Sequence, residues 1–172
     1  MKRRIIMVVL SVFVLFGLVH PAQANEKLGF VSMQKALNSV NESKKIKTDL
    51  QTEYDTKKKQ IDTMKADLEK TNADIEKQKS VLSQDALNQK RQDLQTKFMD
   101  LQNKAATYER ELTTKESENA KRILLKLREI VLDISKKEGY TLVLENSMDT
   151  VLYSQGGTDI TESVITAYNN KK

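Results

Sequence analysis

A run of 109 residues without glycine or proline, from Phe30 to Glu138, is the feature that most restricts the fold of this 172-residue chain. Turns and strand ends use these two residues heavily, whereas helix interiors exclude them. The same run is rich in Lys, Glu, Gln, Leu, Asp and Ala, a composition typical of long helices. We therefore expect long helices to make up most of the chain.

Apolar residues within this run recur at intervals of three and four, which is the spacing of a coiled-coil seam. The first seam comprises Ile46, Leu50, Tyr54, Ile61, Met64, Leu68, Ile75 and Leu82. The second comprises Leu87, Leu94, Phe98, Leu101, Ala105, Tyr108 and Leu112. The pattern predicts helices over 42–80 and 84–138 that form an antiparallel coiled-coil hairpin. Residues 42–122 would project as an arm with its tip near 80–84.

The segments before and after the arm predict a small β-rich body, made of residues 25–41 and 123–172. The sequence of residues 27–31 predicts a strand, and Ser32 can cap a short helix that follows it. A body of this size has no disulfide to stabilise it, because the chain has no Cys. Such small cores need an additional source of stability, so we expect the body to self-associate.

The end of the chain predicts further strands and one more helix. Gly139 suits the left-handed position that follows a helix. Residues 140–145 and 150–154 are β-rich and flank a polar turn, which predicts a β-hairpin. Thr158 or Asp159 is expected to cap a terminal helix. The predicted fold class is α+β and mostly helical, with a β-rich oligomerisation body that carries the long hairpin.

Residues 1–24 predict an export signal that is removed by cleavage. Lys2-Arg3-Arg4 precedes a 15-residue apolar run from Ile5 to Val19, and Ala22-Gln23-Ala24 places small residues just before Asn25. This order is typical of secretory signals. An uncleaved anchor is the alternative, but the apolar run is shorter than the roughly 20 residues that a spanning helix needs.

The mature chain would lack Cys, His, Trp and Pro, because His20 and Pro21 both lie in the signal. It therefore has no Cys or His nucleophile and no thiolate or imidazole metal ligand. It also has no glycine-rich phosphate loop, so we predict neither an enzyme nor a cofactor. With 26 basic and 24 acidic residues its net charge is +2, which together with export disfavours a nucleic-acid partner.

The order of these segments resembles the Skp (OmpH-like) periplasmic chaperone family across essentially the whole mature chain. The long charged hairpin contributes to the resemblance, but short motifs around it are more specific. These motifs are Lys27-Leu28-Gly29-Phe30-Val31 with Ser32-Met33-Gln34, Gly139-Tyr140-Thr141-Leu142-Val143-Leu144-Glu145, Val151-Leu152-Tyr153-Ser154 and Thr158-Asp159-Ile160-Thr161.

The resemblance implies an ATP-independent holdase. Three subunits of such a protein share a β-rich body, and three hairpins project like the tentacles of a jellyfish around a cavity. The cavity would hold unfolded outer-membrane proteins in the periplasm. Members of the family are often strongly basic. Because this mature chain is only +2, we expect at most weak contact with anionic lipid or lipopolysaccharide.

Five arm residues are candidates for contact with a client protein. Lys57, Lys58 and Lys59 form the only cationic triplet of the arm, while Met64 and Met99 are adaptable apolar side chains. Each has an ordinary alternative role, which is solvation for the lysines and packing for the methionines. A second function also stays open, that of an exported coiled-coil adaptor or structural protein of the cell envelope. An adaptor would bind one folded partner and would not affect the aggregation of unfolded proteins.

Overall fold

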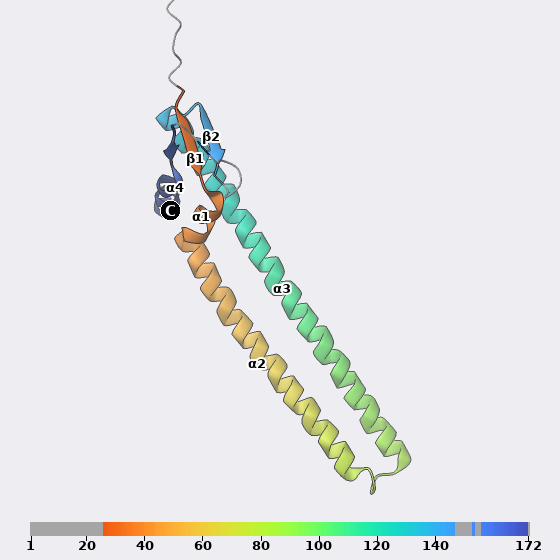
Figure 1. The fold of residues 1–172 in the computed structure, drawn as a ribbon. Coiled ribbons are helices and arrows are strands. Elements are labelled where there is room, and N and C mark those ends of the chain that lie inside the picture. The colour runs from red at the N-terminus through yellow and green to blue at the C-terminus, as the bar shows by residue number, and fades with distance from the viewer. Residues whose placement is uncertain (1–25, 147–152, 154–155, 172) are drawn as a thin grey trace, which may run out of the picture.

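The structure is a computed structural model, which describes residues 26–146, 153 and 156–171. Figure 1 shows two long helices that project from a small body. The mostly helical α+β class predicted from the sequence is thereby confirmed. In chain order, the elements are β1 (Leu28–Val31), α1 (Met33–Ser39), α2 (Asn41–Gln78), α3 (Gln84–Glu138), β2 (Leu142–Glu145), β3 (Thr158–Asp159) and α4 (Thr161–Asn170).

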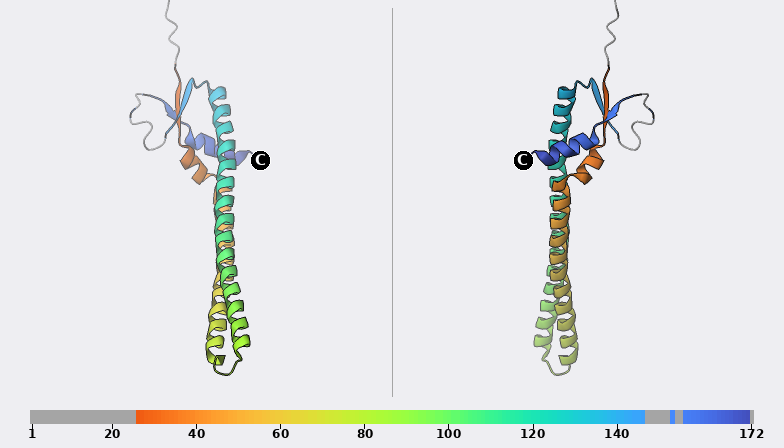
Figure 2. Two further views of the ribbon diagram at one scale, coloured as in Figure 1. Left: turned by 90° about the vertical axis from the view of Figure 1, so that its right-hand side faces the viewer. Right: turned by 90° about the vertical axis from the view of Figure 1, so that its left-hand side faces the viewer.

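The two long helices, α2 and α3, lie side by side and run in opposite directions (Figures 1 and 2). Ion pairs between them show the register. Lys115 Nζ lies 2.7 Å from Glu53 Oε1 near the body, and Lys97 Nζ lies 2.8 Å from Asp67 Oδ2 closer to the tip. The connection between the helices covers only residues 79–83, so the hairpin turns tightly.

Both ends of α3 are determined by local sequence signals. Ser83 caps its start, because the Ser83 hydroxyl accepts a hydrogen bond from the N–H of Ala86. Gly139 ends it with a φ of 73°, and the N–H of Gly139 donates to the carbonyl of Ser135. Glycine adopts this left-handed conformation without the steric cost that a side chain brings. These signals explain why the predicted bounds of 84–138 match the observed helix.

The sheet has three strands in the order β2-β1-β3, and both outer strands run parallel to β1. Leu28 of β1 lies opposite Leu142 of β2, while Phe30 lies opposite Asp159 of β3. The segment before the arm therefore pairs with two segments that follow the arm. This pairing closes the body around the point where the arm leaves it.

The hydrophobic core lies in the body, where the C-terminal part of α3 packs against α1 and α4. Ile123, Leu127 and Ile130 are spaced by four and three residues, so they share one face of α3, and all three are buried. The remaining buried core residues are Val31, Ala36, Val40, Ile160, Val164, Ile165 and Tyr168.

The expectation that Thr158 or Asp159 caps the terminal helix was wrong, because both belong to β3 and the N-cap residue of α4 is Ile160. Asp159 nevertheless contacts the start of the helix. Its Oδ1 accepts a hydrogen bond of 2.8 Å from the N–H of Thr161, and the bonds from Thr161 lower the pKa of the Asp159 carboxyl. The fully buried Thr161 accepts a 2.9 Å hydrogen bond from the N–H of Ser32. These bonds link β3, α4 and the end of β1.

Two predicted segments lie wholly or mostly outside the described residues. They are the export signal of residues 1–24 and the strand of residues 150–154, of which the structure describes only Tyr153. In the part of the chain that is described, no helix is both long and apolar enough to cross a membrane.

Replacing Gly157 by alanine is expected to lower the free energy of unfolding by ~1–3 kcal/mol. Gly157 has a φ of 114°, which side-chain-bearing residues rarely adopt, and an added Cβ would collide with the ring of Phe30. Urea unfolding at a fixed protein concentration measures the effect. Gly156→Ala is the matched control, because a Cβ at Gly156 meets no atom within 4 Å. Equal unfolding midpoints for the two variants would contradict the strain at Gly157.

Candidate functional site

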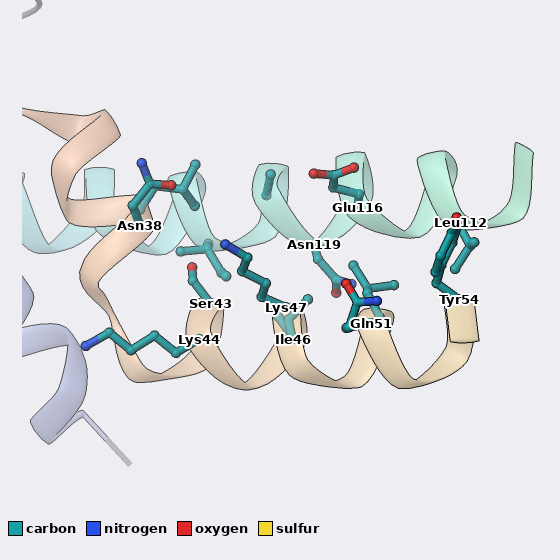
Figure 3. A pocket seen from close by; sticks show the side chains of 14 residues that line it. Asn38, Ser43, Lys44, Ile46, Lys47, Gln51, Tyr54, Leu112, Glu116 and Asn119 are labelled. Carbon is teal, nitrogen blue, oxygen red and sulfur yellow. The ribbon is translucent and has the colours of Figure 1, made fainter. Parts of the chain in front are cut away.

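An open groove of about 810 Å³ lies at the base of the arm, between α1 and the facing sides of α2 and α3 (Figure 3). It has the volume of a small-molecule or side-chain pocket. Its lining residues are Leu37, Asn38, Ser43, Lys44, Ile46, Lys47, Leu50, Gln51, Tyr54, Leu112, Glu116, Asn119, Ala120 and Ile123. Three helices therefore contribute to one concave surface beside the body.

The groove combines an apolar lining with a few polar groups. Leu and Ile side chains from all three helices line it, and Lys44, Lys47 and Glu116 add charge. The Ser43 hydroxyl is buried and has no hydrogen-bond partner within the described residues. A buried polar group is normally satisfied by protein, water or a ligand. The groove is therefore an apolar surface with a few charged groups, and the Ser43 hydroxyl oxygen itself is not exposed in it.

Several large apolar side chains of the arm are exposed, of which Tyr54 lines the groove and the others lie beyond it. The spacing of apolar residues predicts that Tyr54 and Phe98 lie in the seams, yet Tyr54 is 49% exposed and Phe98 is 42% exposed. A seam between only two helices has no third element to cover the outer side of a large ring. Met99 is 53% exposed, and Val81 at the tip is 81% exposed. The arm thus presents apolar contacts at several heights, which is more than the seam pattern alone predicted.

Lys57 turns towards the partner helix. Its Nζ lies 2.7 Å from Glu111 Oε2, 3.4 Å from Glu53 Oε1 and 4.1 Å from the centre of the Tyr108 ring. Its hydrogen bond to Glu111 is the largest influence that raises the pKa of the Lys57 ammonium. Lys57 therefore connects α2 to α3, and its charged group is already paired.

The other four candidate residues lie elsewhere on the arm surface. Lys58 pairs with Asp62 of its own helix at 3.1 Å, and both line a shallow hollow on α2 together with Lys59. Met64 is half-buried and Met99 is exposed. None of the five candidates lines the groove. The groove was not predicted from the sequence, because it forms where three helices meet. Ile46, Leu50 and Tyr54, which line it, were predicted only as members of the first seam.

The described residues contain no group of three Asp, Glu, His or Cys side chains that could hold a metal ion. Six of the sixteen carboxylates of the arm, which the structure describes throughout, form ion pairs between or along the helices, such as Glu53 with Lys115. The candidate site is therefore a surface of apolar side chains that also carries the charged groups of Lys44, Lys47 and Glu116.

Lys57→Gln is expected to lower the urea midpoint of unfolding more than Lys58→Gln does. The Lys57 change removes an ion pair and a ring contact that join the two helices, whereas the Lys58 change removes one exposed pair within α2. Exposed pairs contribute little to stability. Circular dichroism during urea titration provides the measurement, and equal midpoints would show that the cross-helix contacts of Lys57 do not stabilise the arm.

Comparison with known proteins places this geometry in a family. Among solved structures, a candidate OmpH-like outer membrane chaperone from Caulobacter crescentus CB15 has a similar fold, with a TM-score of 0.78 at 20% sequence identity. The similarity covers 87% of each chain. No curated protein matches the chain. The model of the family described as outer membrane protein (OmpH-like) matches residues 27–168, so this chain belongs to the OmpH-like family.

Proposed function

We propose that this chain is an ATP-independent holdase chaperone that binds unfolded outer-membrane proteins and prevents their aggregation. The observation that carries the proposal is the exposure of Tyr54, Phe98 and Met99 on an arm that otherwise carries mixed charge. Membership of the OmpH-like family and the fold shared with a candidate outer membrane chaperone support a chaperone role.

Weak contacts distributed along the arm suit an unfolded client. Such a client offers apolar side chains at many places, so one deep pocket would hold only a short part of it. The groove offers an apolar surface at the base, while Phe98 and Met99 offer another nearer the tip. Contacts of this kind reinforce one another when they belong to one chain, because each bound segment raises the effective concentration of the next.

The five candidate residues take different parts in this proposal. We keep Lys58, Lys59, Met64 and Met99 as contact residues on the surface of the arm. Lys57 instead holds α2 against α3 through Glu111, so we propose that it shapes the arm and does not touch the client.

The double variant Tyr54→Ala/Phe98→Ala is expected to protect an unfolded client less well than the wild type does. Burying a large apolar side chain contributes roughly 1.5–3 kcal/mol, so loss of two partial contacts should weaken holding ~10-fold or more. The measurement is light scattering after dilution of a urea-unfolded outer-membrane β-barrel into buffer that contains each protein.

The matched control for this experiment is Lys65→Ala/Gln95→Ala, which replaces two exposed polar side chains on the same helices. It should protect as well as the wild type at equal helicity and equal mass. If the wild type itself leaves aggregation unchanged, the holdase is excluded and the envelope adaptor becomes the better description. If both double variants lose protection equally, the exposed aromatic side chains are not the contacts.

We further propose that three copies assemble through the body and leave the arms around a shared cavity. Exposed apolar side chains cluster on body elements: Leu125 and Leu132 share one face of α3, while Leu142 and Leu144 share one face of β2. β2 is also an edge strand whose outer side pairs with no described strand. Unpaired edges and exposed apolar patches are typical of surfaces that a partner covers.

The double variant Leu125→Glu/Leu132→Glu is expected to reduce the assembly to single chains. Both leucines are more than half exposed, so the change should leave the subunit folded while it introduces charge into the proposed contact. Native mass spectrometry measures the assembly. Lys136→Glu/Lys137→Glu, which changes two exposed positions at the end of the same helix, is the control and should keep the wild-type mass. An unchanged mass for the leucine variant would exclude this face of α3 from the interface.

The location that we propose is the periplasm, after cleavage of residues 1–24. The charged start, apolar run and Ala22-Gln23-Ala24 support export. Anionic lipid or lipopolysaccharide would make only weak contact, since the mature chain carries a net charge of +2.

A further inference from the structure

The junction between α1 and α2 is a single residue, Val40, at which the helical path breaks. Val40 has an extended conformation with ψ of 145° and ends α1 while it precedes α2. Its side chain is fully buried in the core, but it provides no side-chain cap for α2. Hinges in proteins are commonly a few residues at element ends of this kind. The direction of α2 therefore depends on its packing along α3 and, at this end, on other contacts of its first turn.

The C-terminal helix α4 supplies those contacts. Asn169 Oδ1 accepts a 2.9 Å hydrogen bond from the N–H of Asn41, the first residue of α2. The Tyr168 hydroxyl donates a 2.6 Å hydrogen bond to Glu42 Oε2. The N–H groups at the start of a helix have no partner within the helix. Asn169 thus caps α2 from a helix that lies 128 residues away in the sequence.

Glu42 also connects the first turn of α2 to α3. Its two carboxylate oxygens accept hydrogen bonds from Arg122 at 3.1 Å and from Lys126 at 3.2 Å. The hydrogen bond from Tyr168 is the largest influence that lowers the pKa of Glu42, while burial, followed by the bond to Glu42, raises the pKa of Tyr168. At neutral pH the tyrosine is therefore the donor and the carboxylate the acceptor. One side chain of α2 joins α4 and α3 at the same point.

The groove starts one residue after this cluster. Ser43, Lys44, Ile46 and Lys47 line the groove and follow Glu42 directly on α2. A rotation of α2 about Val40 would move these side chains relative to α3, which is anchored in the core by Ile123, Leu127 and Ile130. The contacts of Glu42 therefore hold α2 at the end where its side chains line the groove.

We propose that the last turn of α4, through Tyr168 and Asn169, is a latch that holds the first turn of α2 and sets the opening of the groove. When the latch is closed, α2 lies against α3 as observed. When it is open, α2 pivots about Val40 and the groove widens to admit larger segments. Only the identity of the segment that enters the groove rests on the proposed function. The latch itself is a property of the subunit without a client.

The test measures the distance between spin labels on α2 and on the anchored end of α3. The chain has no natural cysteine, so Lys45→Cys and Lys136→Cys provide two unique attachment sites. Labelled chains are mixed with an excess of unlabelled chains, which leaves only distances within one subunit. The latch variant is Tyr168→Phe/Asn169→Ala, in which the aromatic ring stays in the core while both hydrogen bonds are lost. Tyr153→Phe/Asn170→Ala makes the same chemical changes at two exposed positions and is the control.

The latch predicts a distance distribution for the Tyr168 and Asn169 variant that is broader than in the wild type and shifted to longer values. The control variant should reproduce the wild-type distribution, and circular dichroism should be the same for all three proteins. Identical distributions in the latch variant and the wild type would overturn the proposal. Equal broadening in the control would overturn it as well, because α4 would then be loose for reasons other than these two contacts. All measurements use protein without client, so failure of the holdase assay would leave this result unaffected.

Discussion

The structure depends on the packing of one face of α3 in the body. Ile123, Leu127 and Ile130 are buried against α1 and α4, while the rest of this 55-residue helix runs out along the arm. An isolated two-helix hairpin buries little apolar surface and gains most of its stability where it meets other elements. The body therefore anchors the arm through one continuous helix. The second helix of the arm, α2, has no such continuity and depends on the contacts of its first turn and on its packing and ion pairs along α3.

Local signals made much of this fold predictable from the sequence. Ser83 and Gly139 mark the two ends of α3, and the Gly- and Pro-free run between Phe30 and Glu138 required long helices. The strand β3 was not predicted, because its two residues pair with β1, which precedes the arm in the sequence. A local sequence pattern does not indicate so distant a partner. Thr158 and Asp159 are typical cap residues, so the local preference pointed to the wrong element.

The site was less predictable than the fold. Regular spacing assigned Tyr54 and Phe98 to the seams, but spacing cannot show that about half of each side chain stays exposed. Lys57 and Lys58 are neighbours in the same charged triplet, yet only Lys57 reaches across to α3. Which of them does so depends on the rotation of α2 about its axis. The groove requires the position of α1 as well, which is set by the break at Val40.

The parallel pairing of β1 with β2 has a consequence for how the length of the arm can vary. The two strands are separated by the whole hairpin, but α2 and α3 return the chain to its starting point, where Glu42 meets Arg122. Helical turns removed or added in matching pairs would therefore alter the reach of the hairpin without disturbing the sheet. The reach of the hairpin and the structure of the body can thus change independently in evolution, so proteins that share the same body can differ in the length of their arms.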